Sequence, residues 1–236
     1  MQLTNFFVSI LLLSTTMVFG SDPNKKAVLN ESLQTYISAI KKDFAKIPKE
    51  RKKELDKIAL FVQNKIKSGE QVQLTYICTH NSRRSHFGQI WAATAAAYYG
   101  IPNVRTYSGG TEATAFNERA VAACKRAGFE ISKISDDKNP IYEVKYASDA
   151  EPLRAFSKKY DDSNNPQSGF CAIMTCSQAD EACPVVKGAT ARVAIPYNDP
   201  KAFDGKPEET AKYDERCKQI ATETLYVFSK VRQGIR

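Results

Sequence analysis

The chain has 236 residues, of which 42% are hydrophobic and 25% charged. This composition is that of a globular protein and excludes collagen-like, low-complexity and wholly disordered chains. The net charge of +8 is concentrated in residues 21–69, which hold 12 basic and 6 acidic side chains, whereas residues 70–236 hold 22 basic and 20 acidic ones. A basic segment on a nearly neutral body does not indicate nucleic-acid binding. The six Cys and two His show no zinc-binding spacing, so we expect no metal site.

The first twenty residues carry no charged side chain, and residues 6–20 form an apolar run. This run is shorter than the roughly 20 residues of a transmembrane helix. It is typical of a secretory signal peptide, with Val18 and Gly20 placed before a cleavage site. We therefore expect residues 1–20 to direct export to the periplasm or cell envelope; an uncleaved N-terminal membrane anchor is the alternative.

Residues 21–69 are predicted to form a basic helical arm. Apolar residues recur at helical spacing on both sides of Pro48, and Gly69 is placed to end the second helix. The opposite faces are basic and are expected to be solvated; contact with an anionic membrane surface is a less favoured alternative. These basic residues are Lys41, Lys42, Lys49, Arg51, Lys52 and Lys53.

Residues 70–236 are predicted to form one catalytic domain in which strands alternate with helices. The expected strands are 71–77, 104–107, 170–175 and 191–196, with a candidate strand at 141–146; the expected helices are 85–99, 117–127 and 207–231. This order predicts an α/β fold with an open, mostly parallel four-stranded sheet and helices on both faces. The polar, turn-rich stretch 157–168 is expected to be a surface insertion.

Three of these strands end in residues with reactive side chains. The first runs into Cys78, the strand at 170–175 runs into Cys176, and the strand at 191–196 is followed by Asp199. In an open parallel sheet all carboxyl ends lie along one edge, where ligands bind. We therefore expect two sulfurs and a carboxylate to share one crevice.

The first of these junctions reads Cys-Thr-His-Asn-Ser-Arg-Arg-Ser over residues 78–85. Loop N–H groups, the positive end of the following helix and the guanidinium of Arg84 together suit a tetrahedral oxyanion. The same features stabilise a Cys78 thiolate, which would be a nucleophile aimed at the central atom of that oxyanion. The expected oxyanion-binding residues are Thr79, His80, Asn81, Ser82, Arg83, Arg84 and Ser85.

This loop resembles the phosphate-binding loop of low-molecular-weight protein tyrosine phosphatases and of the arsenate reductases that share their fold. The likeness covers residues 71–236 and includes the run Tyr-Ser-Gly-Gly at 107–110. It implies that Cys78 is the nucleophile, that Arg84 binds the oxyanion and that Ser85 hydrogen-bonds the thiolate. It also implies that Asn81 maintains the shape of the loop and that Asp199, which precedes a proline, is the general acid.

Two residues of the loop depart from the family pattern. The family usually has glycine where His80 stands and cysteine where Arg83 stands. His80 is therefore expected either to crowd the loop or to contact the substrate, and Arg83 adds positive charge.

A second motif resembles the paired cysteines of thioredoxin-coupled arsenate reductases: Cys176 and Cys183, with six residues between them and a proline after them. The resemblance implies a relay in which Cys176 attacks Cys78 and Cys183 attacks Cys176. A permanent structural disulfide and two unrelated buried thiols remain the alternatives. If residues 176–183 were helical, their ends would lie about 10 Å apart, whereas disulfide Cα atoms lie roughly 4.4–6.8 Å apart. The segment is therefore expected to be a loop or to unwind.

Three functions follow from these motifs. The first is an arsenate reductase that uses Cys78, Cys176 and Cys183, with an external thioredoxin-like dithiol as reductant and no bound cofactor. The second is a phosphatase, such as one acting on phosphotyrosine, that hydrolyses phosphate monoesters through a phosphocysteine, with Asp199 as general acid. The third is a non-catalytic oxyanion-binding protein. Arsenate and phosphate share shape and charge, so the loop alone does not separate the first two.

Overall fold

The structure is a computed structural model that describes residues 27–235. The expected signal peptide or anchor lies outside the described residues. Between residues 27 and 235, no helix combines the length and the apolar character that crossing a membrane requires.

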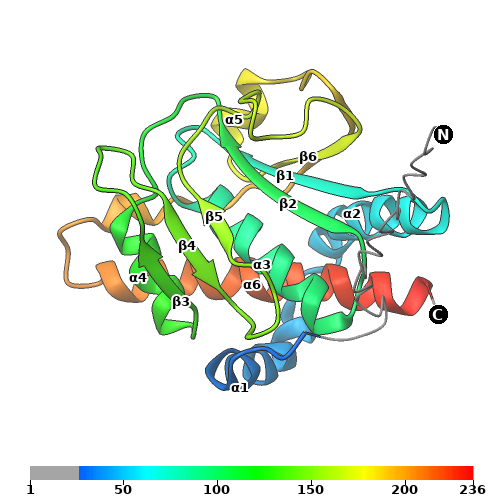
Figure 1. The fold of residues 1–236 in the computed structure, drawn as a ribbon, viewed down its shortest axis with the longest axis horizontal. Coiled ribbons are helices and arrows are strands. Elements are labelled where there is room, and N and C mark those ends of the chain that lie inside the picture. Colours follow the sequence, from blue (N-terminus) through cyan, green and yellow to red (C-terminus); the bar gives the residue numbers. More distant parts are fainter. Residues whose placement is uncertain (1–26, 236) are drawn as a thin grey trace, which may run out of the picture.

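The main sheet has four strands, all parallel, in the order β2-β1-β6-β7. This confirms the predicted open parallel sheet (Figure 1). The strands are β1 (Val72–Cys78), β2 (Val104–Gly110), β6 (Phe170–Met174) and β7 (Ala189–Ala194). Every residue of β1 except Gln73 is buried, because helices or connecting segments cover both faces of the sheet.

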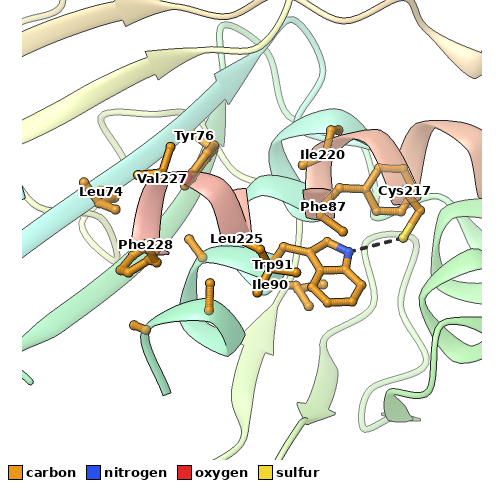
Figure 2. Close-up of a cluster of buried hydrophobic side chains, with 14 of the residues drawn as sticks. Leu74, Tyr76, Phe87, Ile90, Trp91, Cys217, Ile220, Leu225, Val227 and Phe228 are labelled. Carbon is orange, nitrogen blue, oxygen red and sulfur yellow. Dashed lines mark hydrogen bonds between the residues drawn. The ribbon is translucent and has the colours of Figure 1, made fainter. Parts of the chain in front are cut away.

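One face of the sheet packs against α3 (Arg84–Tyr99) and α6 (Glu209–Gly234). Figure 2 shows Trp91 of α3 lying against α6, with its indole N–H donating to Cys217 Sγ at 3.3 Å, while Leu74 and Tyr76 extend from β1 into the same cluster. The opposite face buries a second, smaller apolar cluster under the short helix α5 (Ser177–Ala182). Helices therefore lie on both faces, as the alternation of strands and helices predicts.

A second sheet was not expected from the sequence. It is antiparallel, with the order β3-β4-β5, and it follows α4 (Glu118–Arg126). Its strands are β3 (Glu130–Lys133), β4 (Tyr142–Lys145) and β5 (Leu153–Ala155). The candidate strand at 141–146 thus exists, but it belongs to this sheet rather than to the parallel one.

The N-terminal segment forms α1 (Glu31–Ile40), a 3-10 turn (Lys41–Lys46) and α2 (Lys49–Lys67), which confirms the two helices on either side of Pro48. Their apolar faces join the core of the parallel sheet, and the ring of Tyr36 stacks on Trp91 at 5.5 Å. The expectation of a solvated basic face is wrong for Arg51. Its guanidinium is mostly buried and pairs with Glu223 of α6 at 2.9 Å.

Candidate active site

The backbone keeps the candidate residues together beyond the ends of the strands. After β6, Thr175 N donates to Ile77 O at 2.7 Å; after β7, Tyr197 N donates to Thr175 O at 3.0 Å. The residues that follow, Cys176 and Asp199, are therefore held at the edge where β1 ends in Cys78. The strand order predicts this common edge.

The loop after β1 is tied down by its carbonyl groups. The carbonyls of residues 78, 79, 80 and 82 all accept hydrogen bonds from segments that follow β2 or β5. The donors are Thr111 N at 3.2 Å, Glu112 N at 2.8 Å, Thr114 Oγ1 at 3.1 Å, Ser157 Oγ at 3.0 Å and Asn117 N at 3.0 Å. Among the described residues, no backbone acceptor pairs with the N–H groups of residues 79–83. With the carbonyls engaged by neighbouring segments, these N–H groups keep the capacity to donate to a ligand, as an anion-binding loop requires.

Asn81 organises the interior of this loop. It adopts a left-handed conformation with φ of 44°, which asparagine tolerates better than most residues. Its amide donates to Ser85 Oγ at 2.8 Å and accepts from Lys158 N at 2.8 Å. Ser85 Oγ in turn lies 3.1 Å from Cys78 Sγ. The structure thus places a hydroxyl beside the sulfur of Cys78 and fixes that hydroxyl through Asn81.

Gly110, at the end of β2, allows the loop to pass close by. A Cβ at this position would lie 2.6 Å from Thr79 O and 2.7 Å from Asn81 N. Both are backbone atoms, so the loop would have to move if this residue carried a side chain. This close approach accounts for Gly110, the second glycine of the run at 107–110.

Arg84 and Asp199 lie together. Arg84 donates to Tyr197 O at 2.9 Å and to Asp199 Oδ2 at 2.8 Å. Its Nε is buried and has no hydrogen-bond partner among the described residues. A buried guanidinium N–H without a partner is costly, and an oxyanion in the loop is the kind of ligand that relieves this cost.

The two residues that depart from the family pattern do not act alike. His80 is half exposed, and its Nε2 lies 3.6 Å from Glu112 Oε2. The guanidinium of Arg83 is buried and donates to the hydroxyl of Tyr213 at 2.8 Å. The side chain of Arg83 therefore reaches the start of α6, while its backbone stays in the loop.

Cys176 and Cys183 are both free thiols and flank α5, as its N-cap and C-cap. Cys176 Sγ lies 3.4 Å from Thr79 Oγ1 and is buried in the smaller apolar cluster with Cys78, against which Cys183 packs. The three sulfurs thus border one cluster. The residues between Cys176 and Cys183 are helical, so of the two expected cases, a loop or a segment that unwinds, the second applies: a disulfide between them requires α5 to unwind.

The stretch 157–168 is not a simple surface insertion. Ser157, Lys158 and Asn165 are buried, since they hydrogen-bond backbone or side-chain groups of the loop and of β2. Burial lowers the pKa of Lys158 to about 8. Burial also lowers the pKa of His86 on α3, and the charge of Lys158 adds to this effect. Polar composition suggested exposure, and the sequence holds no signal for backbone partners so far away along the chain.

No group of three or more His, Cys, Asp or Glu side chains within residues 27–235 could hold a metal ion. The described residues bring together a cysteine sulfur, a loop whose N–H groups have no backbone acceptor, an Arg–Asp pair and two further thiols.

No protein-family model matches the chain. Among curated proteins, an arsenate reductase of Bacillus subtilis is 25% identical over 155 residues, which cover 66% of this chain and 93% of that protein. An arsenate reductase of Halalkalibacterium halodurans is 28% identical over 134 residues, covering 57% of this chain and 78% of that protein.

Among solved structures, an arsenate reductase in the phosphate-binding state is 17% identical, with a TM-score of 0.44 and coverage of 68% of this chain and 99% of that chain. A low-molecular-weight phosphotyrosine phosphatase from Vibrio cholerae O395 is 13% identical, with a TM-score of 0.45 and coverage of 70% and 99%.

Proposed function

We propose that this chain, which is 25–28% identical to curated arsenate reductases, is an enzyme that reduces arsenate through Cys78, Cys176 and Cys183. The loop N–H groups and Arg84 bind arsenate. The Cys78 thiolate attacks arsenic and forms an S–As bond, while one oxygen leaves as water after Asp199 supplies a proton.

The relay then moves two electrons from sulfur to arsenic. The Cys176 thiolate attacks Cys78 Sγ, and the S–As bond breaks with its electron pair passing to arsenic, which leaves as arsenite. Cys183 next attacks Cys176 and frees Cys78 as a thiolate. The resulting 176–183 disulfide is reduced by an external dithiol, which we propose to be thioredoxin-like.

One observation carries this proposal over the alternatives: Cys176 lies in the same buried cluster as Cys78, and its Sγ is 3.4 Å from the hydroxyl of Thr79, the residue next to Cys78. A phosphatase needs no second thiol at this place. Cys183 is less buried than Cys176 and stands at the far end of α5, which suits the thiol that presents the final disulfide to a partner.

Phosphate-monoester hydrolysis is the second candidate, favoured by the contact between Arg84 and Asp199 at 2.8 Å. That contact places a carboxyl group beside the arginine expected to bind the phosphoryl oxygens. In this reaction Asp199 would protonate the leaving oxygen, and water would hydrolyse the phosphocysteine.

The deciding experiment assays one purified sample on arsenate with a dithiol reductant and on an aryl phosphate. Cys78→Ser should abolish both activities. Cys176→Ser and Cys183→Ser should abolish arsenate reduction and spare any aryl-phosphate hydrolysis. Cys124→Ala, which changes a buried thiol on α4, is the control and should leave arsenate reduction within about twofold. Arsenate reduction that persists without Cys176 would exclude the relay.

We also propose that the chain is exported, since its first twenty residues have the pattern of a signal peptide. An exported relay requires a reductant outside the cytoplasm. Cell fractionation with N-terminal sequencing of the mature protein tests this, and an intact N-terminus in the membrane fraction would favour the anchor instead.

A further inference from the structure

Two successive arginines of the loop hold opposite ends of the turn that carries Asp199. This 3-10 turn (Pro200–Phe203) is preceded by Asp199 and followed by Asp204. Arg84 binds Asp199 Oδ2 at 2.8 Å. Arg83 lies 3.6 Å from Asp204 Oδ2 and 3.9 Å from Asp199 Oδ1.

A buried tyrosine strengthens the contact of Arg83. Arg83 Nε donates to the hydroxyl of Tyr213 at 2.8 Å, and that hydroxyl donates to Asp204 Oδ1 at 2.8 Å. Both Arg83 and Tyr213 are buried. Burial raises the pKa of Tyr213 to about 12, so its hydroxyl keeps the proton that it donates to Asp204 throughout the neutral pH range.

The far side of the turn is fixed as well. Arg119 of α4 binds Glu209 at 2.7 Å and lies 3.9 Å from Asp204, while Glu209 accepts from Gly205 N at 2.6 Å. The segment 199–205 is thereby connected to the loop, α4 and α6. Arg83 and Arg84 are the members of this network that belong to the loop, and of the two only Arg83 reaches Asp204.

We infer that Arg83 is a positioning residue for Asp199. Its side chain is bound to Tyr213 and Asp204 and is therefore not available to the substrate. Through these contacts Arg83 fixes the position of Asp199 relative to the loop. The inference rests on the proposed role of Asp199 as proton donor, which both candidate reactions use. Loss of Arg83 should therefore slow the step that needs this proton and leave oxyanion binding intact.

The test compares kcat/KM of wild type and Arg83→Met on two aryl phosphates, one with a poor leaving group (phenyl) and one with a good leaving group (2,4-dinitrophenyl). A general acid matters for the first and little for the second. We expect Arg83→Met to lose about 10- to 100-fold on phenyl phosphate and less than about threefold on the dinitrophenyl ester. The affinity for tungstate, a tetrahedral oxyanion that is not turned over, should stay within about threefold.

A double substitution and a control sharpen the result. Arg83→Met should add nothing to the loss caused by Asp199→Asn, because both act through one proton transfer. Arg126→Met is the matched control, since Arg126 of α4 also pairs with a carboxylate of α6, Asp214 at 2.7 Å, but has no hydrogen bond or ion pair with the 199–205 segment within residues 27–235. It should change neither ester. Equal losses on both esters, weakened tungstate binding, or additive losses would overturn the inference.

If the wild type hydrolyses neither ester, the same comparison is made in single-turnover arsenate reduction, where Arg83→Met should slow adduct formation to the extent that Asp199→Asn does. If it is inactive there too, the proposed function fails, and a crystal structure of Arg83→Met with tungstate decides the positioning. A displaced Asp199 that no longer contacts Arg84 supports it, and an unmoved Asp199 refutes it.

Discussion

Lys158 is a buried ammonium group in the segment that braces the oxyanion-binding loop. It is 5% exposed. Its Nζ lies 3.4 Å from Phe156 O and 4.4 Å from the centre of the Phe156 ring. Burial lowers the pKa of Lys158 to about 8, although the nearby Asp162 favours the charged form. The other titratable group facing it is His86, whose own pKa is lowered by burial and by Lys158.

This lowered pKa predicts that Lys158 costs stability at neutral pH. The unfolded chain keeps the proton of Lys158 up to its ordinary pKa of 10.5, whereas the folded chain releases it near pH 8. The free energy of unfolding therefore rises between pH 8 and 10.5, and below pH 8 the full penalty is present. Lys158→Met should raise the free energy of unfolding at pH 7 by about 2–3 kcal/mol, and this gain should vanish by about pH 10.5.

Urea unfolding at pH 7, 9 and 10.5 measures this effect, with Lys159→Met as control. Lys159 is the exposed neighbour, so its substitution should change stability by less than about 0.5 kcal/mol at every pH. A Lys158→Met protein that is less stable than the wild type at pH 7 would contradict the prediction and would mean that the ammonium is stabilised by the loop.

The six-residue helix α5 is the element whose conformation the proposed relay must change. The helix has only six residues and one buried side chain, Ala179, so it is marginal by itself. Arg192 of β7 holds its C-terminal half by donating to the carboxylate and carbonyl of Asp180 and to Cys183 O. Glu181 is exposed and is the penultimate residue of α5. Glu181→Gly should weaken the helix by about 1 kcal/mol relative to Glu181→Ala and should speed formation of the 176–183 disulfide about fivefold.

This rate is measured without arsenate by adding a small disulfide reagent to the reduced protein as oxidant. The thiols that remain free at each time are alkylated and counted by mass spectrometry. Cys78→Ser, combined with each Glu181 variant, removes the competing nucleophile. Equal rates for the glycine and alanine variants would show that α5 does not have to unwind before the two sulfurs meet.

The elements also show what the sequence was able to predict. The sequence predicts β1, Cys78 and α3 from local signals. An apolar run, a polar loop and a segment with apolar residues at helical spacing follow one another within thirty residues. β3 and β5 were missed because they are four and three residues long, and each buries a single side chain. Too few alternating positions remain in such strands for a period of two to be detected.

The same limit applies to the candidate site. The loop and its strand–helix context were predictable, since they depend on neighbouring residues. The contacts of Ser157 and Lys158 with the loop, and those of Arg83 with Tyr213, join residues more than 70 positions apart. No periodicity encodes such pairs, and a buried polar side chain that serves a distant partner looks the same in sequence as a solvated one.

At the scale of the whole molecule, the N-terminal helix α2 is connected to Arg84 of the candidate site. Arg51 of α2 binds Glu223 at 2.9 Å and Ile195 O at 3.2 Å, and its guanidinium lies 4.6 Å from the centre of the Tyr197 ring. The hydroxyl of Tyr197 donates to the same carboxylate at 2.8 Å. The carbonyl of Tyr197 in turn accepts from Arg84 at 2.9 Å. A segment expected to be an appendage is thus two contacts away from the oxyanion-binding loop.

Arg51→Met should destabilise the protein far more than loss of a surface charge would. It removes the cation that pairs with the carboxylate of Glu223, which is 4% exposed. Breaking such a pair costs about 3–5 kcal/mol. Lys53→Met is the matched control on the same helix: its pair with Glu50 is exposed, so its loss should cost less than about 1 kcal/mol.

Adding Glu223→Gln to Arg51→Met separates the charge from the packing. The amide removes the unpaired charge and still accepts from Tyr197, so it should restore more than half of the lost stability in urea unfolding at pH 7. We also expect Arg51→Met to weaken tungstate binding, because Tyr197 loses its contact with Arg51 and its carbonyl positions Arg84. Glu223→Gln should not restore this affinity. Full recovery of tungstate affinity together with stability would show that α2 stabilises the fold without positioning Arg84.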